Sequence, residues 1–76
     1  MLVRMSMQGR SLGARIRHAR VEKGWTQQQL ATAVGTRERN VGRWEGDQNE
    51  PRLDAIAALA RALDKPLEYF MNGTPA

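Results

Sequence analysis

A chain of 76 residues is enough for one small domain, which buries only about 60–65% of its unfolded surface, and the absence of cysteine excludes a disulfide framework or a cysteine-ligated zinc site. No apolar run approaches the ~20 residues of a membrane span, and residues 1–10 lack the apolar segment of a signal peptide, so we expect a cytoplasmic protein. Residues 1–43 contain nine Lys/Arg and two acidic residues (net +7), whereas residues 44–76 contain three Lys/Arg and six acidic residues (net −3). This asymmetry favours a surface that faces a polyanion, although a solvated basic helix would also fit.

The first expected helix spans residues 12–23. Residues 1–10 show no periodicity, so we expect a flexible tail before a domain at residues 11–74. Ser11 is a suitable N-cap, and Gly24 ends the helix. The stripe that faces the core is expected to contain Leu12, Ile16, Ala19 and Arg20.

Two short helices separated by one glycine are expected next. Thr26 and Gln29 have the spacing of a capping box, so the second helix begins after Thr26 and continues to about Val34, with Leu30, Ala31 and Val34 buried. Gly35 stands where a left-handed residue is needed. Thr36 or Arg37 opens the third helix, which reaches Trp44 or Glu45. Val41 and Trp44 share its inward face, which leaves the polar side chains to face a DNA major groove: Arg37, Glu38, Arg39, Asn40 and Arg43.

The rest of the chain predicts two further helices. After a polar loop at residues 46–50, Pro51 suits the first turn of a fourth helix. Its core stripe is expected to contain Leu53, Ile56, Ala57, Ala60 and Leu63. Lys65-Pro66 ends it, and a fifth helix at residues 67–71 places Leu67, Phe70 and Met71 inward, stopped by Asn72-Gly73. No strand pattern is present, so the predicted fold is all-α with five short helices.

These segments resemble the Cro/C1-type (XRE) helix-turn-helix domains, including those of lambdoid phage repressors. The resemblance covers residues 11 to 74 and consists of L-G-x-x-I-R-x-x-R at 12–20, K-G-W-T-Q-x-x-L-A at 23–31, V-G-T at 34–36, R-W-E at 43–45, P-x-L at 51–53, L-A-x-A-L at 59–63 and L-E-Y-F-M-N-G at 67–73. The set in this order and spacing is highly specific. It implies the lambda-repressor-like fold and operator binding by a symmetric dimer, with each third helix in a major groove.

The resemblance also implies roles for individual residues. Glu38, Arg39 and Arg43 match positions that usually contact base edges, and their chemistry fits, because Arg can bond guanine O6 and N7 while Glu accepts from the cytosine amino group. For the two arginines, phosphate contact or plain exposure are the alternatives. The residues expected at phosphates or in the minor groove are Gln27, Gln28, Arg37, Asn40 and Arg52, of which Asn40 could instead contact an adenine.

The resemblance further implies that Arg20 and Glu45 form a buried, structural ion pair between the first and third helices. The loop after the third helix is acidic, with Asp47 at the expected turn position, so we expect this loop to add little affinity for DNA. Gly42 lies inside the third helix at a cost of about 1 kcal/mol relative to alanine, which either a close approach to DNA or tolerated drift would explain.

Several other side chains permit two interpretations. Trp25 and Trp44 could stack on bases, but their spacing favours packing against the first two helices. Arg15 and Arg17 could contact flanking phosphates or be solvated, and His18 is expected to be exposed. Tyr69, Phe70 and Met71 could form a dimer contact, although Phe70 fits the core better.

The resulting hypothesis is a sequence-specific DNA-binding transcriptional regulator, most simply a repressor that recognises a palindromic operator. It would act on double-stranded DNA as a weak homodimer, in the cytoplasm at the nucleoid, without metal or cofactor. No nucleophile with paired acids, phosphate loop or ligand cluster indicates an enzyme. The alternative is a protein-interaction module of the same fold, such as an antitoxin or coactivator adaptor, for which the acidic 44–76 half would serve.

Overall fold

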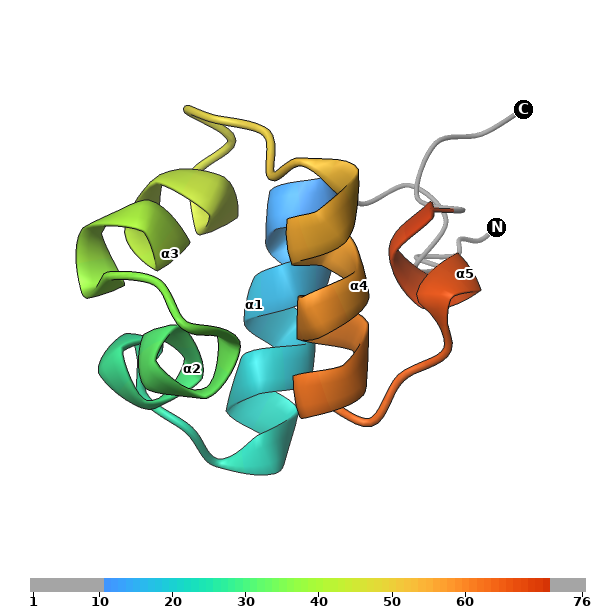
Figure 1. Ribbon diagram of the computed structural model, residues 1–76, viewed down its shortest axis with the longest axis horizontal. Helices are drawn as coiled ribbons and strands as arrows, with labels where there is room; N and C mark the ends of the chain where they lie inside the picture. The colour runs from blue at the N-terminus through green and yellow to red at the C-terminus, as the bar shows by residue number, and fades with distance from the viewer. Residues whose placement is uncertain (1–10, 72–76) are drawn as a thin grey trace, which may run out of the picture.

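The computed structural model describes residues 11–71, which form five α-helices and, within that range, no strand. The helices are α1 (Leu12–Lys23), α2 (Gln27–Val34), α3 (Glu38–Glu45), α4 (Leu53–Ala62) and α5 (Leu67–Met71) (Figure 1). The predicted all-α fold is therefore confirmed. The expected tail at residues 1–10 and the stop at Asn72-Gly73 lie outside the described residues.

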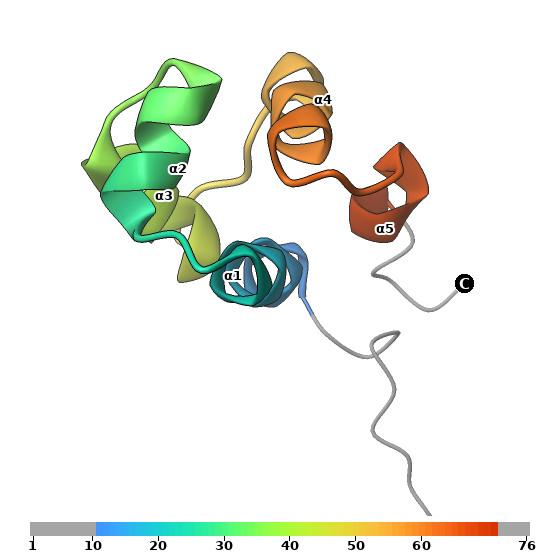
Figure 2. The same ribbon diagram turned by 90° about the horizontal axis from the view of Figure 1, so that it is seen from below.

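Two pairs of helices are joined by α1. Figures 1 and 2 show α2 and α3 on one side of the molecule and α4 and α5 on the other. In Figure 2, α1 lies beneath both pairs, and it contacts α3 as well as α5. Within residues 11–71, no helix covers the outer side of α3.

Local hydrogen bonds explain where the first helices begin and end. Ser11 accepts a bond from the backbone N–H of Ala14, and Thr26 and Gln29 form the predicted capping box. Gly24 and Gly35 follow α1 and α2 in the left-handed conformation, with φ of 81° and 78°. The caps, and hence the short α1–α2 and α2–α3 links, were thus readable from the sequence.

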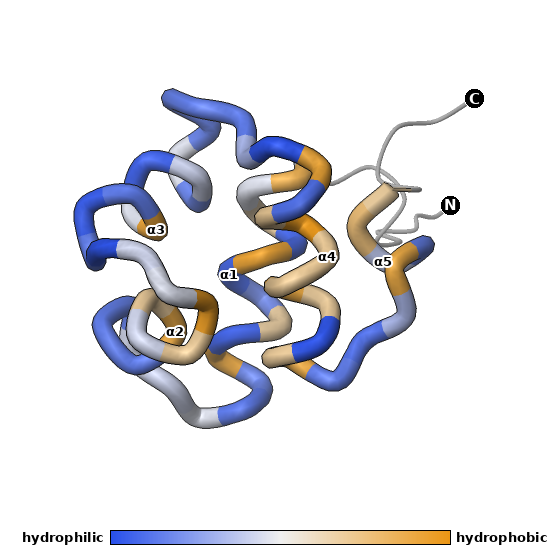
Figure 3. Tube along the Cα trace, in the orientation of Figure 1, coloured by the Kyte–Doolittle hydropathy of each residue, from blue (hydrophilic) through white to orange (hydrophobic). Residues whose placement is uncertain are grey.

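The core is formed by side chains from all five helices. Its fully or nearly fully buried members are Ile16, Ala19, Leu30, Ala31, Val41, Ile56, Leu59, Ala60, Leu63 and Phe70. Both tryptophans are half-buried against this cluster, as the packing interpretation predicts. Most of α3 and the loop after it consist of hydrophilic residues, coloured blue in Figure 3.

The expected core stripes of α4 and α5 are partly wrong. Leu53 is 63% exposed and Ala57 is also exposed, while Leu59, which was not expected in the stripe, is fully buried. In α5 only Phe70 is buried, whereas Leu67 and Met71 are 42% and 50% exposed. α4 packs against α2 and α5, and α5 packs against α1 and α4. Each of these short helices therefore buries a narrow face, and residues at the edge of that face remain in solvent.

Three helix ends also differ from the prediction. Pro51 is a buried residue before α4, not part of its first turn, because Arg52 has the extended conformation of an N-cap. Likewise α3 begins at Glu38, after an extended Arg37, so neither Thr36 nor Arg37 is its first helical residue. α4 ends at Ala62, before Lys65-Pro66, with Asp64 left-handed at φ 58°.

Candidate nucleic-acid interface

The uncovered side of α3 carries the side chains that were predicted to contact bases. Val41 is fully buried and fixes the inner side of the helix. Glu38, Arg39 and Arg43 are all exposed, and the two arginines lie four residues apart, which places them on one helix face. Two guanidinium groups and one carboxylate thus lie on the exposed face of α3, whose opposite face is packed against the core.

Asn40 lies next to this face and is half-buried. Its Nδ2 donates to the Thr36 hydroxyl at 2.8 Å, which leaves Oδ1 and the second amide hydrogen available. Arg37 precedes α3 as its N-cap residue and is exposed, with no side-chain capping bond.

The N-terminus of α2 places further polar groups beside α3. Gln29 N–H is bonded to the Thr26 hydroxyl and Leu30 N–H to the Thr26 carbonyl, so the capping box leaves the N–H groups of Gln27 and Gln28 as first-turn donors. The side chain of Gln28 is exposed and donates to Thr32 at 3.2 Å, whereas that of Gln27 is half-buried and points to α3.

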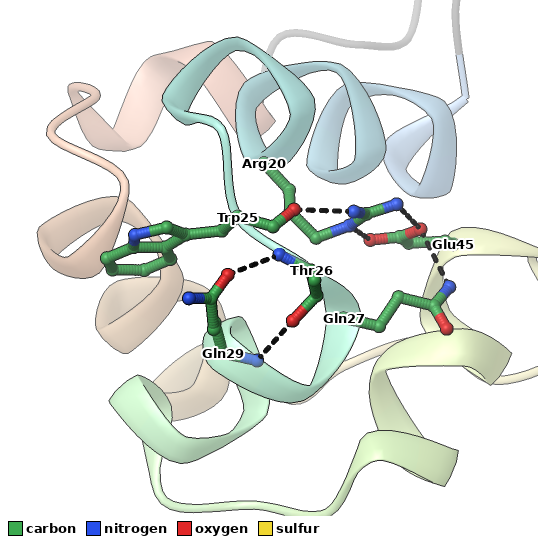
Figure 4. A network of polar contacts seen from close by, with 6 residues as sticks. All are labelled: Arg20, Trp25, Thr26, Gln27, Gln29 and Glu45. Carbon is green, nitrogen blue, oxygen red and sulfur yellow. Dashed lines mark hydrogen bonds and ion pairs between the residues drawn. The ribbon is translucent and has the colours of Figure 1, made fainter.

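A polar network joins the links and ends of the first three helices (Figure 4). Arg20 Nε lies 2.6 Å from Glu45 Oε2, and its Nη2 lies 3.0 Å from Oε1. Both side chains are withdrawn from water, at 12% and 3% exposure. The third guanidinium nitrogen donates to the Trp25 carbonyl at 2.8 Å, and Gln27 Nε2 donates to Glu45 Oε1 at 3.0 Å. This network ties α1, the α1–α2 link, α2 and the end of α3 together.

The loop after α3 is fastened to the start of α1 by Asp47. Its Oδ1 accepts from the Gly13 backbone N–H at 3.0 Å and its Oδ2 from the Ser11 hydroxyl at 2.7 Å. The backbone of Asp47 is left-handed at φ 59°, as its turn position predicts. A Cβ on Gly13 would lie 2.3 Å from the Trp44 carbonyl oxygen, so this approach of α1 to α3 requires glycine. Asp47 therefore acts as an anchor and helix cap, a role that its charge alone did not indicate.

Arg15 is the clearest failure of the sequence interpretation. It is neither solvated nor directed outward to flanking phosphates, because it is 4% exposed and its Nη1 donates to the Tyr69 carbonyl of α5 at 2.8 Å. Its guanidinium also lies 5.7 Å from the centroid of the Tyr69 ring. The spacing of Leu12, Arg15, Ile16 and Ala19 on one helical face could have indicated this burial.

Fewer basic side chains among residues 11–43 are exposed and unpaired than the charge count indicates. Arg15 and Arg20 are withdrawn from the surface, and Lys23 Nζ pairs with Asp64 at 2.8 Å. Within residues 11–43, the remaining arginines are exposed: Arg17, Arg37, Arg39 and Arg43. Three of these four lie on α3 or at its N-cap, so exposed positive charge concentrates there. Arg52 is exposed at the N-cap of α4, and His18 is exposed on α1, as expected.

Among residues 11–71, no helix is long and apolar enough to cross a membrane. The same part of the chain contains no group of three or more His, Cys, Asp or Glu side chains that could hold a metal ion.

Comparison with known proteins gives a consistent result. The helix-turn-helix family model matches residues 16–70. The SPbeta prophage-derived uncharacterized HTH-type transcriptional regulator YonR of Bacillus subtilis is 30% identical over 64 residues, which cover 84% of this chain and 59% of that protein. Among solved structures, the P22 c2 repressor in complex with a synthetic operator is 30% identical with a TM-score of 0.77, covering 80% of this chain and 92% of that one.

A third similar protein is the restriction-modification controller protein C.AhdI of Aeromonas hydrophila. It is 36% identical with a TM-score of 0.75, and the match covers 78% of this chain and 89% of that one. The chain spans about half the length of the curated relatives that it matches. These relatives are named as regulators, and the family is not one of enzymes.

Proposed function

Because the chain belongs to the Cro/C1-type helix-turn-helix family, we propose that it is a DNA-binding transcriptional regulator, with residues 11–74 as the domain that contacts DNA. The finer proposal is a repressor that recognises a palindromic operator by inserting α3 into the major groove. Such a protein would work in the cytoplasm, at the nucleoid.

The observation that carries the proposal is the outward face of α3. Arg39 and Arg43 are exposed although the buried Val41 lies on the same short helix. Neither arginine is packed against the core, because both lie on the exposed face of α3, whereas each could bond one guanine through two donors. Glu38 at the start of the helix could accept from a cytosine amino group. We propose these three residues as the base-contacting set.

The phosphate contacts are proposed from the ends of α2, α3 and α4. Backbone N–H groups of Gln27 and Gln28 combine hydrogen-bond donors with the positive end of the α2 dipole, which suits a phosphate oxygen. Arg37 is the N-cap residue before α3 and Asn40 lies in the first turn of α3, while Arg52 precedes α4 beyond the Asp47-anchored loop. Of this set only the arginines neutralise charge.

Dimer formation is proposed from the apolar groups left in solvent on α4 and α5. Leu53, Leu67 and Met71 are between 42% and 63% exposed, although each is large and hydrophobic. One α3 spans about four or five base pairs, so a symmetric pair doubles the length that is recognised and predicts half-sites roughly 10 base pairs apart. Three such side chains are few for a stable interface, so we expect a monomer at micromolar concentration that pairs on DNA.

The experiment that tests the proposal is a selection from genomic fragments, followed by titration of the enriched sequence at two salt concentrations. We expect a near-palindromic site whose affinity falls at least about tenfold when salt is tripled, since each neutralised phosphate adds about −0.9 to the salt slope. Arg39→Ala or Arg43→Ala should weaken binding and relax the preference at one base pair per half-site. Unchanged base preferences in both variants would refute α3 as the element that contacts bases. If the selection enriched no DNA and the chain instead captured a protein, the interaction-module alternative would be favoured.

A further inference from the structure

The Gln27 side chain is held by a buried carboxylate and not by solvent. Its Nε2 donates to Glu45 Oε1 at 3.0 Å, and the Glu45 side chain is only 3% exposed. We propose that Glu45 is a positioning residue for DNA binding, an inference that rests on the proposed function. It orients the Gln27 amide so that one Nε2 hydrogen is used inside the protein and the other can be donated to a DNA phosphate.

The charge on Glu45 selects this orientation of the amide. Rotating the Gln27 amide by half a turn would place its carbonyl oxygen against the carboxylate, acceptor against acceptor, and lose the bond. The carboxylate cannot turn away, because Arg20 binds both of its oxygens and is itself bonded to the Trp25 carbonyl. A rigid series of contacts therefore runs from the α1–α2 link to the first side chain of α2.

Gly42 lies next to the Gln27 amide. A Cβ built on Gly42 would lie 3.7 Å from Gln27 Oε1 and 3.9 Å from Nε2, which is ordinary contact. The amide of Gln27 therefore lies over Gly42, and a side chain longer than alanine at this position would compete with it. The Gln27 amide therefore limits the size of the side chain at position 42 but leaves room for alanine.

The functional gain is preorganisation. A free glutamine side chain must lose rotamer freedom when it binds a phosphate, whereas the Gln27 side chain is already ordered across α2 and α3. Gln28 provides the contrast, since its amide is exposed and bonds only Thr32 within the same helix. The two neighbouring glutamines should therefore respond differently to the loss of the Glu45 charge.

The test is a double-mutant cycle for affinity to the selected operator, with Gln27→Ala, Glu45→Gln and the double variant. Affinities are measured where circular dichroism shows each protein folded. Gln27→Ala should weaken binding about tenfold, as expected for one hydrogen bond to a charged group. Glu45→Gln should cause a similar loss when Gln27 is present and less than about a twofold loss in the Gln27→Ala background. In the matched cycle with Gln28→Ala, the effect of Glu45→Gln should be the same in both backgrounds.

Equal losses from Glu45→Gln in the wild-type and Gln27→Ala backgrounds would overturn the inference while leaving the proposed function intact. Wild-type protein that binds no operator would instead overturn the proposed function, and the inference with it.

A second measurement does not depend on a variant that must fold. In NMR spectra of the wild-type protein, one Gln27 amide proton should be shifted downfield and exchange slowly compared with those of Gln29, whose amide oxygen rather than nitrogen is bonded. Equivalent behaviour of the two side chains would also refute the positioning role.

Discussion

Removing the Glu45 carboxylate should destabilise this domain more than any change to an exposed ion pair. In Glu45→Ala, the Arg20 guanidinium loses two bonds at 2.6 and 3.0 Å, although its side chain is only 12% exposed to water. Only its bond to the Trp25 carbonyl survives, and the Gln27 amide loses its acceptor as well. The substitution therefore leaves a charge in a poorly hydrated site without its counter-ion.

The expected magnitude follows from that burial. Breaking a buried pair costs about 3–5 kcal/mol. A 76-residue domain has a free energy of unfolding of roughly 4–11 kcal/mol, so the loss is a large share of the total. A loss of about 3 kcal/mol should lower Tm by about 12 °C or more for a domain of this size.

Thermal and urea unfolding followed by circular dichroism would measure the effect. Glu22→Ala is the matched control, because Glu22 pairs with Lys65 at 2.8 Å but its side chain is 54% exposed, so its loss should move Tm little. Replacing both Arg20 and Glu45 by leucine should restore much of the stability, since no charge is then stranded. Equal, small shifts for Glu45→Ala and Glu22→Ala would refute the argument from burial.

Three further outcomes are expected. Gly13→Ala should destabilise the domain by about 1–3 kcal/mol in urea titrations, because the new Cβ would lie 2.3 Å from the Trp44 carbonyl oxygen; a neutral effect would show that α1 can move away at no cost. Gly42→Ala should raise the free energy of unfolding by up to about 1 kcal/mol with operator affinity preserved, since the nearest atom is 3.7 Å away, and lost affinity would indicate close approach of DNA to this backbone. Hydrogen bonds from lysines lower the pKa values of Glu22 and Asp64 below their ordinary 4.5 and 3.8. Their stabilisation is therefore present above about pH 4.5 and lost as pH falls through the folded pKa values. Because both pairs are exposed, Glu22→Gln should reduce the loss between melts at pH 6 and pH 3 only slightly, and salt should reduce this difference; a larger loss in Glu22→Gln than in the wild type would contradict the pair.

Local signals in the sequence were sufficient for the helices themselves. Ser11, Thr26 with Gln29, Gly24 and Gly35 act within one turn of their own position, so their capping roles follow from residue type and spacing. The same holds for the inward face of α3, because its period is local. The exposure of Leu53 and Leu67 was not predictable in this way, since apolar spacing does not reveal how wide a face the neighbouring helices cover.

The polar contacts between distant segments could not be predicted from local spacing. Spacing alone could not pair Arg20 with Glu45, which are 25 residues apart, and the resemblance to known domains was needed to expect it. Nothing in the sequence indicated that Gln27 would share that carboxylate, that Asp47 would cap α1, or that Arg15 would donate to the backbone of α5.

The sequence by itself thus determined which segments become helices, where they begin and end to within two residues, and which face of α3 carries the arginines, because each of these depends on interactions within a few residues. The tertiary structure decided which charges remain at the surface. Arg15, Arg20 and Lys23 count as basic in the sequence, yet packing of α1 against α3 and α5 withdraws the first two and the turn after α4 supplies Asp64 to the third. Long side chains reach partners from distant segments, so their availability to DNA depends on how the helices are packed and not on the order of residues along the chain.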